Sequence, residues 1–131
     1  MDRHRLAARV TLVQGDLFEP VAGRYDLILC NPPYVCEARL AALPAEFRKE
    51  PALALRGGAD GLDIVRAVLR RAADYLEPGG ALIMETGSAS PRLEQVCPAV
   101  PFTWLATAGD AMAVLLLSRD DLRQAAAARQ L

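Results

Sequence analysis

The feature that most constrains this chain is an apolar run, residues 25–30 (YDLILC), followed at once by Asn31-Pro32-Pro33-Tyr34. A short apolar run bounded by turn residues is typical of a buried strand in a parallel sheet. The two prolines end the strand because neither has a backbone N–H to donate. They also stiffen the chain, since proline fixes its own φ angle and restricts the residue before it. We therefore predict a rigid turn, the elbow (residues 31–34), at the carboxyl end of a strand, where ligands bind in open α/β sheets.

The elbow carries groups that suit a planar amide or exocyclic amine. The Asn31 side-chain oxygen and the Pro32 carbonyl are both acceptors, so together they can hold the two hydrogens of one –NH2 group. Tyr34 can stack on the flat face of that group. A nitrogen held in this way would aim its lone pair at an electrophilic methyl group on the opposite side, by positioning and preorganised electrostatics and without a His or Cys base. The alternative interpretation is a strand-ending turn with no chemistry.

On these residues the chain resembles the amino-group methyltransferases that use S-adenosylmethionine, whose motif IV is Asn-Pro-Pro-Tyr after a buried strand. Two branches share this motif, the DNA adenine-N6 methyltransferases and the protein glutamine-N5 methyltransferases (the HemK family). The stretches that resemble the glutamine branch are residues 10–18 (VTLVQGDLF), 25–35 (YDLILCNPPYV), 50–55 (EPALAL), 57–62 (GGADGL) and 81–87 (ALIMETG). Within that branch, residues 44–51, 74–76 and 101–105 look closer to the enzymes for ribosomal protein L-three than to those for peptide release factors.

The resemblance implies an α/β fold, a partial class I methyltransferase (Rossmann-like) domain with a mostly parallel sheet and a C-terminal antiparallel hairpin. It implies S-adenosylmethionine as the cofactor and a glutamine side chain of a translation protein, with ribosomal protein L-three favoured, as the substrate. It implies catalytic roles for Asn31, Pro32 and Tyr34, and substrate contacts along the whole elbow, Pro33 included. By the same resemblance Asn31 also touches the methionine end of the cofactor.

The adenine end of the cofactor is assigned by resemblance to Asp16, Leu17 and Phe18. A carboxylate can accept from the adenine amino group, and the apolar side chains can pack on the ring. The alternative is a turn-forming Asp followed by two core residues. Glu85, at the end of a predicted strand, is interpreted either as a hydrogen-bonded structural acid or as a substrate contact. The charged residues 46–50 are interpreted as a substrate-peptide clamp or as a solvated surface.

Two parts of the family pattern are not found in the sequence. The family's first strand ends in a Gly-rich loop that holds the cofactor's methionine moiety, and its second ends in an acidic residue that binds the ribose hydroxyls. Residues 57–61 (GGADG) are Gly-rich but follow the elbow, so we predict a loop leading into a helix. We interpret residues 1–131 as the C-terminal part of a catalytic domain whose N-terminal helical domain and cofactor loop are absent, and we expect it to be inactive alone.

Composition is that of one globular unit, with 131 residues of which 53% are hydrophobic and 24% charged. We predict no membrane span or signal peptide, because no apolar run approaches the ~20 residues that cross a bilayer. Three cysteines without a CxxC pair indicate reduced thiols in a cytoplasmic protein. The single histidine, His4, has no partner at ligand spacing, so no metal site is predicted. A net charge of −1 without a basic stripe argues against a nucleic-acid platform.

Hydrophobic periodicity predicts alternating strands and helices. The predicted strands are residues 10–14, 25–30, 81–85, 103–107 and 111–118, the last two joined as a hairpin by residues 108–110. Residues 37–60 are predicted to be a long polar loop. One helix should follow Asp60 and end at Pro78, a second should begin at Ser90-Pro91, and a third should run from Ser118 to about Gln130. Both Asp60 with Asp63 and Ser118 with Asp121 have the spacing of a capping box.

The family places its first two strands in the middle of the sheet, so their absence should leave sheet edges open. Either residues 10–14 pair beside residues 25–30, or an apolar edge stays free to pair with another chain. We therefore predict that the chain self-associates. The alternatives to a ribosomal-protein glutamine methyltransferase are a release-factor glutamine methyltransferase, an adenine-N6 DNA or RNA methyltransferase, and a non-catalytic remnant.

Overall fold

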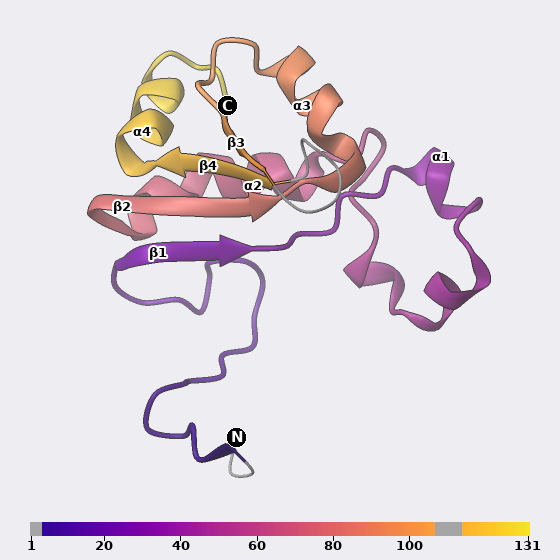
Figure 1. Cartoon of the computed structure of the whole chain (residues 1–131), viewed down its shortest axis with the longest axis horizontal. Helices are drawn as coiled ribbons and strands as arrows, with labels where there is room; N and C mark the ends of the chain where they lie inside the picture. The colour runs from indigo at the N-terminus through magenta and orange to yellow at the C-terminus, as the bar shows by residue number, and fades with distance from the viewer. Residues whose placement is uncertain (1–3, 107–113) are drawn as a thin grey trace.

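The computed structural model describes residues 4–106 and 114–131, which form a four-stranded mixed sheet with helices (Figure 1). The strands are β1 (Tyr25–Cys30), β2 (Leu76–Glu85), β3 (Thr103–Leu105) and β4 (Val114–Ser118). Their order in the sheet is β1-β2-β4-β3. β2 is parallel to β1, whereas β4 is antiparallel to both of its neighbours. The prediction of an α/β sheet is confirmed, and β3 and β4 pair antiparallel as predicted for the C-terminal strands. The sheet is mixed and not mostly parallel, because only one of the three strand pairs in the described residues, β1 with β2, is parallel. The turn predicted at residues 108–110 lies outside the described residues.

Residues 4–106 and 114–131 also include α-helices and short 3-10 turns. The α-helices are α1 (Glu37–Leu40), α2 (Asp63–Ala72), α3 (Ser90–Val96) and α4 (Arg119–Ala127). The 3-10 turns are η2 (Ala45–Lys49), η3 (Ala52–Ala54), η4 (Ala73–Tyr75) and η5 (Gly87–Ala89). The predicted polar loop at residues 37–60 thus contains α1, η2 and η3. Short turns of this kind carry no long hydrophobic period that a sequence pattern would reveal.

One face of the sheet packs against the helices. Strand register places Leu82 beside Leu117 and Met84 beside Leu115, so these four side chains point to the same side. All four are fully buried, and each contributes roughly 1.5–3 kcal/mol of burial free energy. Buried residues of α2, α3 and α4 join them in one cluster. The buried residues of α2 recur at helical spacing and all lie in that cluster, namely Val65, Val68, Leu69 and Ala72.

The opposite face of the sheet is less covered, and β1 is its most exposed strand. Register places Leu29 of β1, Ile83 of β2 and Leu116 of β4 in one row on this face. Ile83 and Leu116 are half-buried, but Leu27 and Leu29 are 49% and 70% exposed. β1 also ends the strand order, so its outer edge has no strand partner in the described part of the chain. β1 pairs in parallel with β2, as predicted. The prediction that β1 is a buried strand is wrong.

The predicted strand at residues 10–14 is also wrong. This stretch has no regular secondary structure, all five residues are exposed, and the indigo N-terminal segment extends away from the sheet (Figure 1). A β-branched run indicates a preference for a half-buried pleated surface, and it becomes a strand only against a partner. Residues 10–14 therefore do not pair beside β1.

The two predicted capping boxes differ in outcome. At the start of α4 both bonds are present: the Asp121 N–H donates to the Ser118 hydroxyl at 3.1 Å, and the Ser118 N–H donates to the Asp121 carboxylate at 2.9 Å. At the start of α2 the N-cap is Leu62, and no side chain caps it. Asp60 instead accepts from the Leu62 N–H at 3.1 Å and forms a bidentate ion pair with Arg66. Asp60 therefore lies at the start of the helix as predicted, but it does not form a capping box with Asp63. Its side-chain partner is the guanidinium of Arg66, in the first turn of α2.

The other predicted boundaries hold only in part. The helix predicted to end at Pro78 is shorter, because α2 ends at Ala72 and η4 follows it. α3 begins at Ser90 with Pro91 in its first turn, as expected for a proline that has no N–H to leave unpaired. β2 begins at Leu76, five residues before the predicted strand at residues 81–85. The register between β1 and β2 shifts across Pro78-Gly79-Gly80, so this turn-like segment forms a bulge in the strand instead of preceding it.

Candidate active site

The elbow lies directly after β1, where the carboxyl ends of β1 and β2 meet. Because the two strands are parallel and Cys30 pairs with Met84, residues that follow both strands emerge at the same edge of the sheet. A cavity of about 500 Å³ opens there, and all four elbow residues line it. The structure therefore brings the predicted catalytic residues into one cavity at the ligand-binding edge of the sheet.

The two acceptors predicted to hold an amide are available in this cavity. Pro32 is buried, which fixes the backbone, whereas Asn31 is exposed. Among the described residues, neither the Asn31 side chain nor the Pro32 carbonyl has a hydrogen-bond partner. Their hydrogen-bonding capacity is thus left for a ligand or for water.

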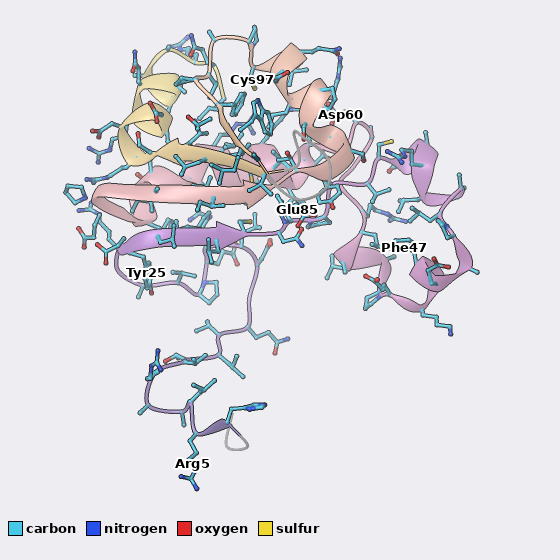
Figure 2. All side chains as sticks on the ribbon, viewed as in Figure 1. Arg5, Tyr25, Phe47, Asp60, Glu85 and Cys97 are labelled. Carbon is cyan, nitrogen blue, oxygen red and sulfur yellow. The ribbon has the colours of Figure 1, made fainter. Side chains whose placement is uncertain are left out.

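The wall opposite the elbow comes from the segment that carries α1, η2 and η3. It supplies the apolar side chains Leu43, Phe47 and Leu55 and two oppositely charged residues, Arg39 and Glu50. Figure 2 shows Phe47 on this segment and Glu85 at the end of the sheet that faces it. Of residues 46–50, predicted as a substrate-peptide clamp or a solvated surface, Phe47 and Glu50 line the cavity. Leu43 was not predicted, because no local pattern in this polar loop marks it as part of a site.

Backbone hydrogen bonds close this segment onto the elbow. The Val35 N–H donates to the Leu55 carbonyl at 3.0 Å, and the Gly57 N–H donates to the Val35 carbonyl at 2.9 Å. Gly61 lies against the elbow at a φ of +83°, and a Cβ there would be 2.5 Å from the Tyr34 carbonyl oxygen. The predicted loop at residues 57–61 is confirmed. Its glycine at position 61 lets the backbone approach Tyr34, and α2 follows directly.

The Tyr34 side chain is held from the end of β2. Its hydroxyl donates a 2.7 Å hydrogen bond to Glu85 Oε1, and both residues line the cavity. Burial, and then the bond to this carboxylate, raises the pKa of Tyr34 to about 12, so the phenol stays protonated at neutral pH. Of the two interpretations of Glu85, the structure shows a hydrogen-bonded acid whose partner is the elbow itself.

Cys30 precedes the elbow and is the nearest thiol in sequence to the predicted catalytic residues. Burial raises the pKa of its thiol to about 11, so it is protonated at neutral pH and is a poor nucleophile. It lines a different pocket, of about 330 Å³, beside the edge of β1. The Cys30 thiol is therefore not a thiolate base or nucleophile for the elbow cavity at neutral pH.

The three residues assigned to adenine by resemblance do not line the elbow cavity. Asp16 forms a turn in which its carbonyl accepts from the Glu19 N–H at 3.0 Å. Phe18 is buried and stacks on Tyr75, with ring centroids 4.6 Å apart, and with Leu17 it lines the smaller pocket along β1. Their arrangement matches the alternative interpretation for Asp16 and Phe18, a turn followed by core packing.

In residues 4–106 and 114–131, no three or more His, Cys, Asp and Glu side chains group closely enough to hold a metal ion. Over the same described ranges, no helix has the length and apolar character needed to span a membrane.

The chain is similar to several curated proteins over about nine tenths of its length. It is 49% identical over 118 residues, 89% of its length, to the ribosomal protein uL3 glutamine methyltransferase of Bordetella pertussis, of which it covers 40%. It is 47% identical over 122 residues to the protein of the same name in Neisseria gonorrhoeae, and 48% identical over 120 residues to that of Bradyrhizobium diazoefficiens. These two matches cover 93% and 91% of this chain and 41% and 38% of the relatives. No protein-family model matches the chain.

The chain is a relative of the ribosomal protein uL3 glutamine methyltransferases. It spans about two fifths of the length of the curated relatives that it matches. The resemblance to the glutamine branch, and within it to the ribosomal-protein enzymes, is therefore confirmed.

Proposed function

We propose that this chain carries the substrate side of a protein-glutamine N5-methyltransferase site, and that its substrate is ribosomal protein uL3. One observation carries the proposal: Asn31, Pro32 and Tyr34 line a single cavity at the carboxyl end of β1, in a chain 49% identical to a uL3 glutamine methyltransferase. A ribosomal-protein substrate would place the activity in the cytoplasm.

In the proposed reaction the elbow prepares the glutamine amide as a nucleophile. The Asn31 side-chain oxygen and the Pro32 carbonyl accept the two amide hydrogens, and the Tyr34 ring stacks on the amide face. Two acceptors on one side leave the nitrogen lone pair pointing away from the elbow, toward the methyl donor. The neutral Tyr34 and the protonated Cys30 leave no general base among these groups, so the effect is one of orientation and fixed dipoles.

We propose S-adenosylmethionine as the methyl donor, which supplies an electrophilic methyl group when bound. The described residues fit one end of it, since Asn31 lies at the open edge of the cavity. The adenine end fits less well, because Leu17 and Phe18 line a separate pocket and Asp16 lines neither. We therefore propose that tight binding of the cofactor requires elements beyond these 131 residues. Calorimetric titration of the chain with S-adenosylhomocysteine tests this: no heat of binding is expected, and micromolar binding would refute it.

We propose that the sheet is part of a class I, Rossmann-like methyltransferase domain. The parallel pair β1 and β2, followed by the antiparallel β4 as the last strand in the chain, is the arrangement that the family resemblance implies for this part of the sheet. The exposed edge of β1 is the position at which further strands would add.

A chimera tests the substrate assignment. This chain would replace the matching segment of the Bordetella pertussis relative, and the chimera would be incubated with S-adenosylmethionine and purified uL3. We expect mass spectrometry to find one methyl group on a uL3 glutamine. Methylation of a release factor in place of uL3, or of adenine in a DNA or RNA oligonucleotide, would instead support one of the alternative functions. Methylation of none of them, by a chimera that folds, would favour the non-catalytic remnant.

We also propose that the isolated chain self-associates through β1. Its outer edge lacks a strand partner among the described residues, and Leu27 and Leu29 are largely exposed on it. Such an edge is a template for pairing with another chain. Sedimentation velocity should show a dimer or larger species, and Leu29→Lys should shift it toward monomer while Lys49→Leu, at an exposed position outside the sheet, does not. A monomer at all concentrations would overturn this proposal.

A further inference from the structure

The ring of Tyr34 is fixed by two neighbours that the proposed chemistry does not otherwise use. At its far end the hydroxyl donates to Glu85 Oε1 at 2.7 Å. Beside it lies Gly87, where a Cβ would be 2.5 Å from Tyr34 Cε2 and 2.6 Å from Cζ. Glu85 is the last residue of β2, and Gly87 comes two residues after it. The ring is therefore held by the end of β2, whereas the elbow follows β1.

Each neighbour restricts a different freedom of the ring. An unanchored tyrosine at a half-buried site samples several χ1 and χ2 values, and a ring that has to lie flat on an amide loses part of its effect when it does so. A hydrogen bond to a carboxylate is stronger than one between neutral groups, so Glu85 fixes where the hydroxyl lies. Gly87 has no side chain, so the ring can lie directly against its backbone at a φ of +46°.

We propose that Glu85 is a positioning residue that holds the Tyr34 ring in its stacking orientation at the wall of the cavity, in a space that Gly87 leaves open. The effect of Glu85 on methyl transfer rests on the proposed function, whereas the hydrogen bond between Tyr34 and Glu85 does not. Glu85 acts through Tyr34, because its Oε1 accepts the hydrogen bond that fixes the phenol. The same bond contributes to the raised pKa of Tyr34, which gives a readout independent of activity.

The first experiment uses the 131-residue chain and no substrate. Tyrosine labelled with 13C at Cζ gives one NMR signal for each of the three tyrosines, and Tyr34→Phe identifies that of Tyr34. We expect the phenol of Tyr34 to ionise near pH 12 in the wild type and at distinctly lower pH in Glu85→Gln, because the negative partner is gone. Glu77→Ala, at the opposite end of β2, should leave the titration unchanged. An unchanged Tyr34 titration in Glu85→Gln would overturn the proposal.

The second experiment measures methyl transfer to uL3 by the chimera. Glu85→Ala should lower kcat/KM by about tenfold to a hundredfold, the range for losing a hydrogen bond to a charged group. Glu85→Gln should stay within about threefold of the wild type, because its amide oxygen still accepts from the phenol. Tyr34→Phe should lower kcat/KM about as much as Glu85→Ala, and adding Glu85→Ala to Tyr34→Phe should cost nothing more.

The outcomes separate the inference from the proposed function. If Glu85→Ala costs a further tenfold in the Tyr34→Phe background, Glu85 contacts the substrate itself and the positioning role is wrong. Equal activity of the wild type and Glu85→Ala also refutes it. If the chimera methylates nothing while the NMR titration shifts as expected, the proposed function fails and the anchoring of Tyr34 by Glu85 stands.

Discussion

Replacing Gly61 by alanine should destabilise the protein through its contact with the elbow. Gly61 has a φ of +83°, where an L-residue costs about 1–2 kcal/mol. A Cβ there would also be 2.5 Å from the Tyr34 carbonyl oxygen, a backbone atom that cannot rotate away. Relieving such a contact typically costs about 1–3 kcal/mol. We therefore expect Gly61→Ala to lower the free energy of unfolding by roughly 2–5 kcal/mol.

Gly23 provides a matched control. Its φ is +85°, almost the same as that of Gly61, but nothing lies within 4 Å of an added Cβ. Gly23→Ala should therefore cost only the conformational part, about 1–2 kcal/mol. Urea unfolding followed by circular dichroism gives both values, and their difference isolates the contact with the elbow. If the two variants lose the same stability within about 0.5 kcal/mol, the close approach of Gly61 to Tyr34 does not constrain the fold.

Two further predictions concern the residues at the starts of α2 and α4. Ser118→Ala removes the hydroxyl that accepts from the Asp121 N–H, and we expect a loss of about 1 kcal/mol in urea unfolding; no measurable loss would mean that the capping box contributes nothing. The hydrogen bonds from Arg66 hold the pKa of Asp60 below its usual range. A lowered folded-state pKa contributes stability that is present above the unfolded value, near 4, and is lost as the pH falls through the folded value. Thermal unfolding between pH 7 and pH 2 should show this loss of stability at low pH. The loss should be smaller in Asp60→Asn, and identical pH profiles of the two proteins would contradict the role of the ion pair.

The sequence predicts an element's bounds correctly where a hydrophobic pattern and the residues that end or begin it are adjacent in the chain. β1 has the predicted bounds because an apolar run meets Pro32 and Pro33, which are incompatible with a continued ladder. α4 begins where predicted because the bonds of its capping box join residues only three apart. The apolar face of α2 is predictable for the same reason, since a helical period reports burial directly.

The parts that were not predicted depend on partners distant in sequence. Residues 10–14 have strand-forming side chains but no strand to pair with, so they remain exposed. β1 is exposed because nothing in the described part of the chain covers its outer edge. The wall of the cavity formed by Leu43 and Phe47 exists only once Val35 pairs with Leu55, and no local pattern reports that pairing.

The measurement that tests the account most directly is methyl transfer to uL3 by the chimera with and without Asn31→Ala. Asn31 is exposed at the cavity and has no hydrogen-bond partner among the described residues, so the substitution should leave urea unfolding nearly unchanged. If its amide oxygen holds the glutamine –NH2 group, the turnover number should fall by about a hundredfold or more. Turnover within tenfold of the unsubstituted chimera would contradict the central claim that the elbow orients the amide for methylation.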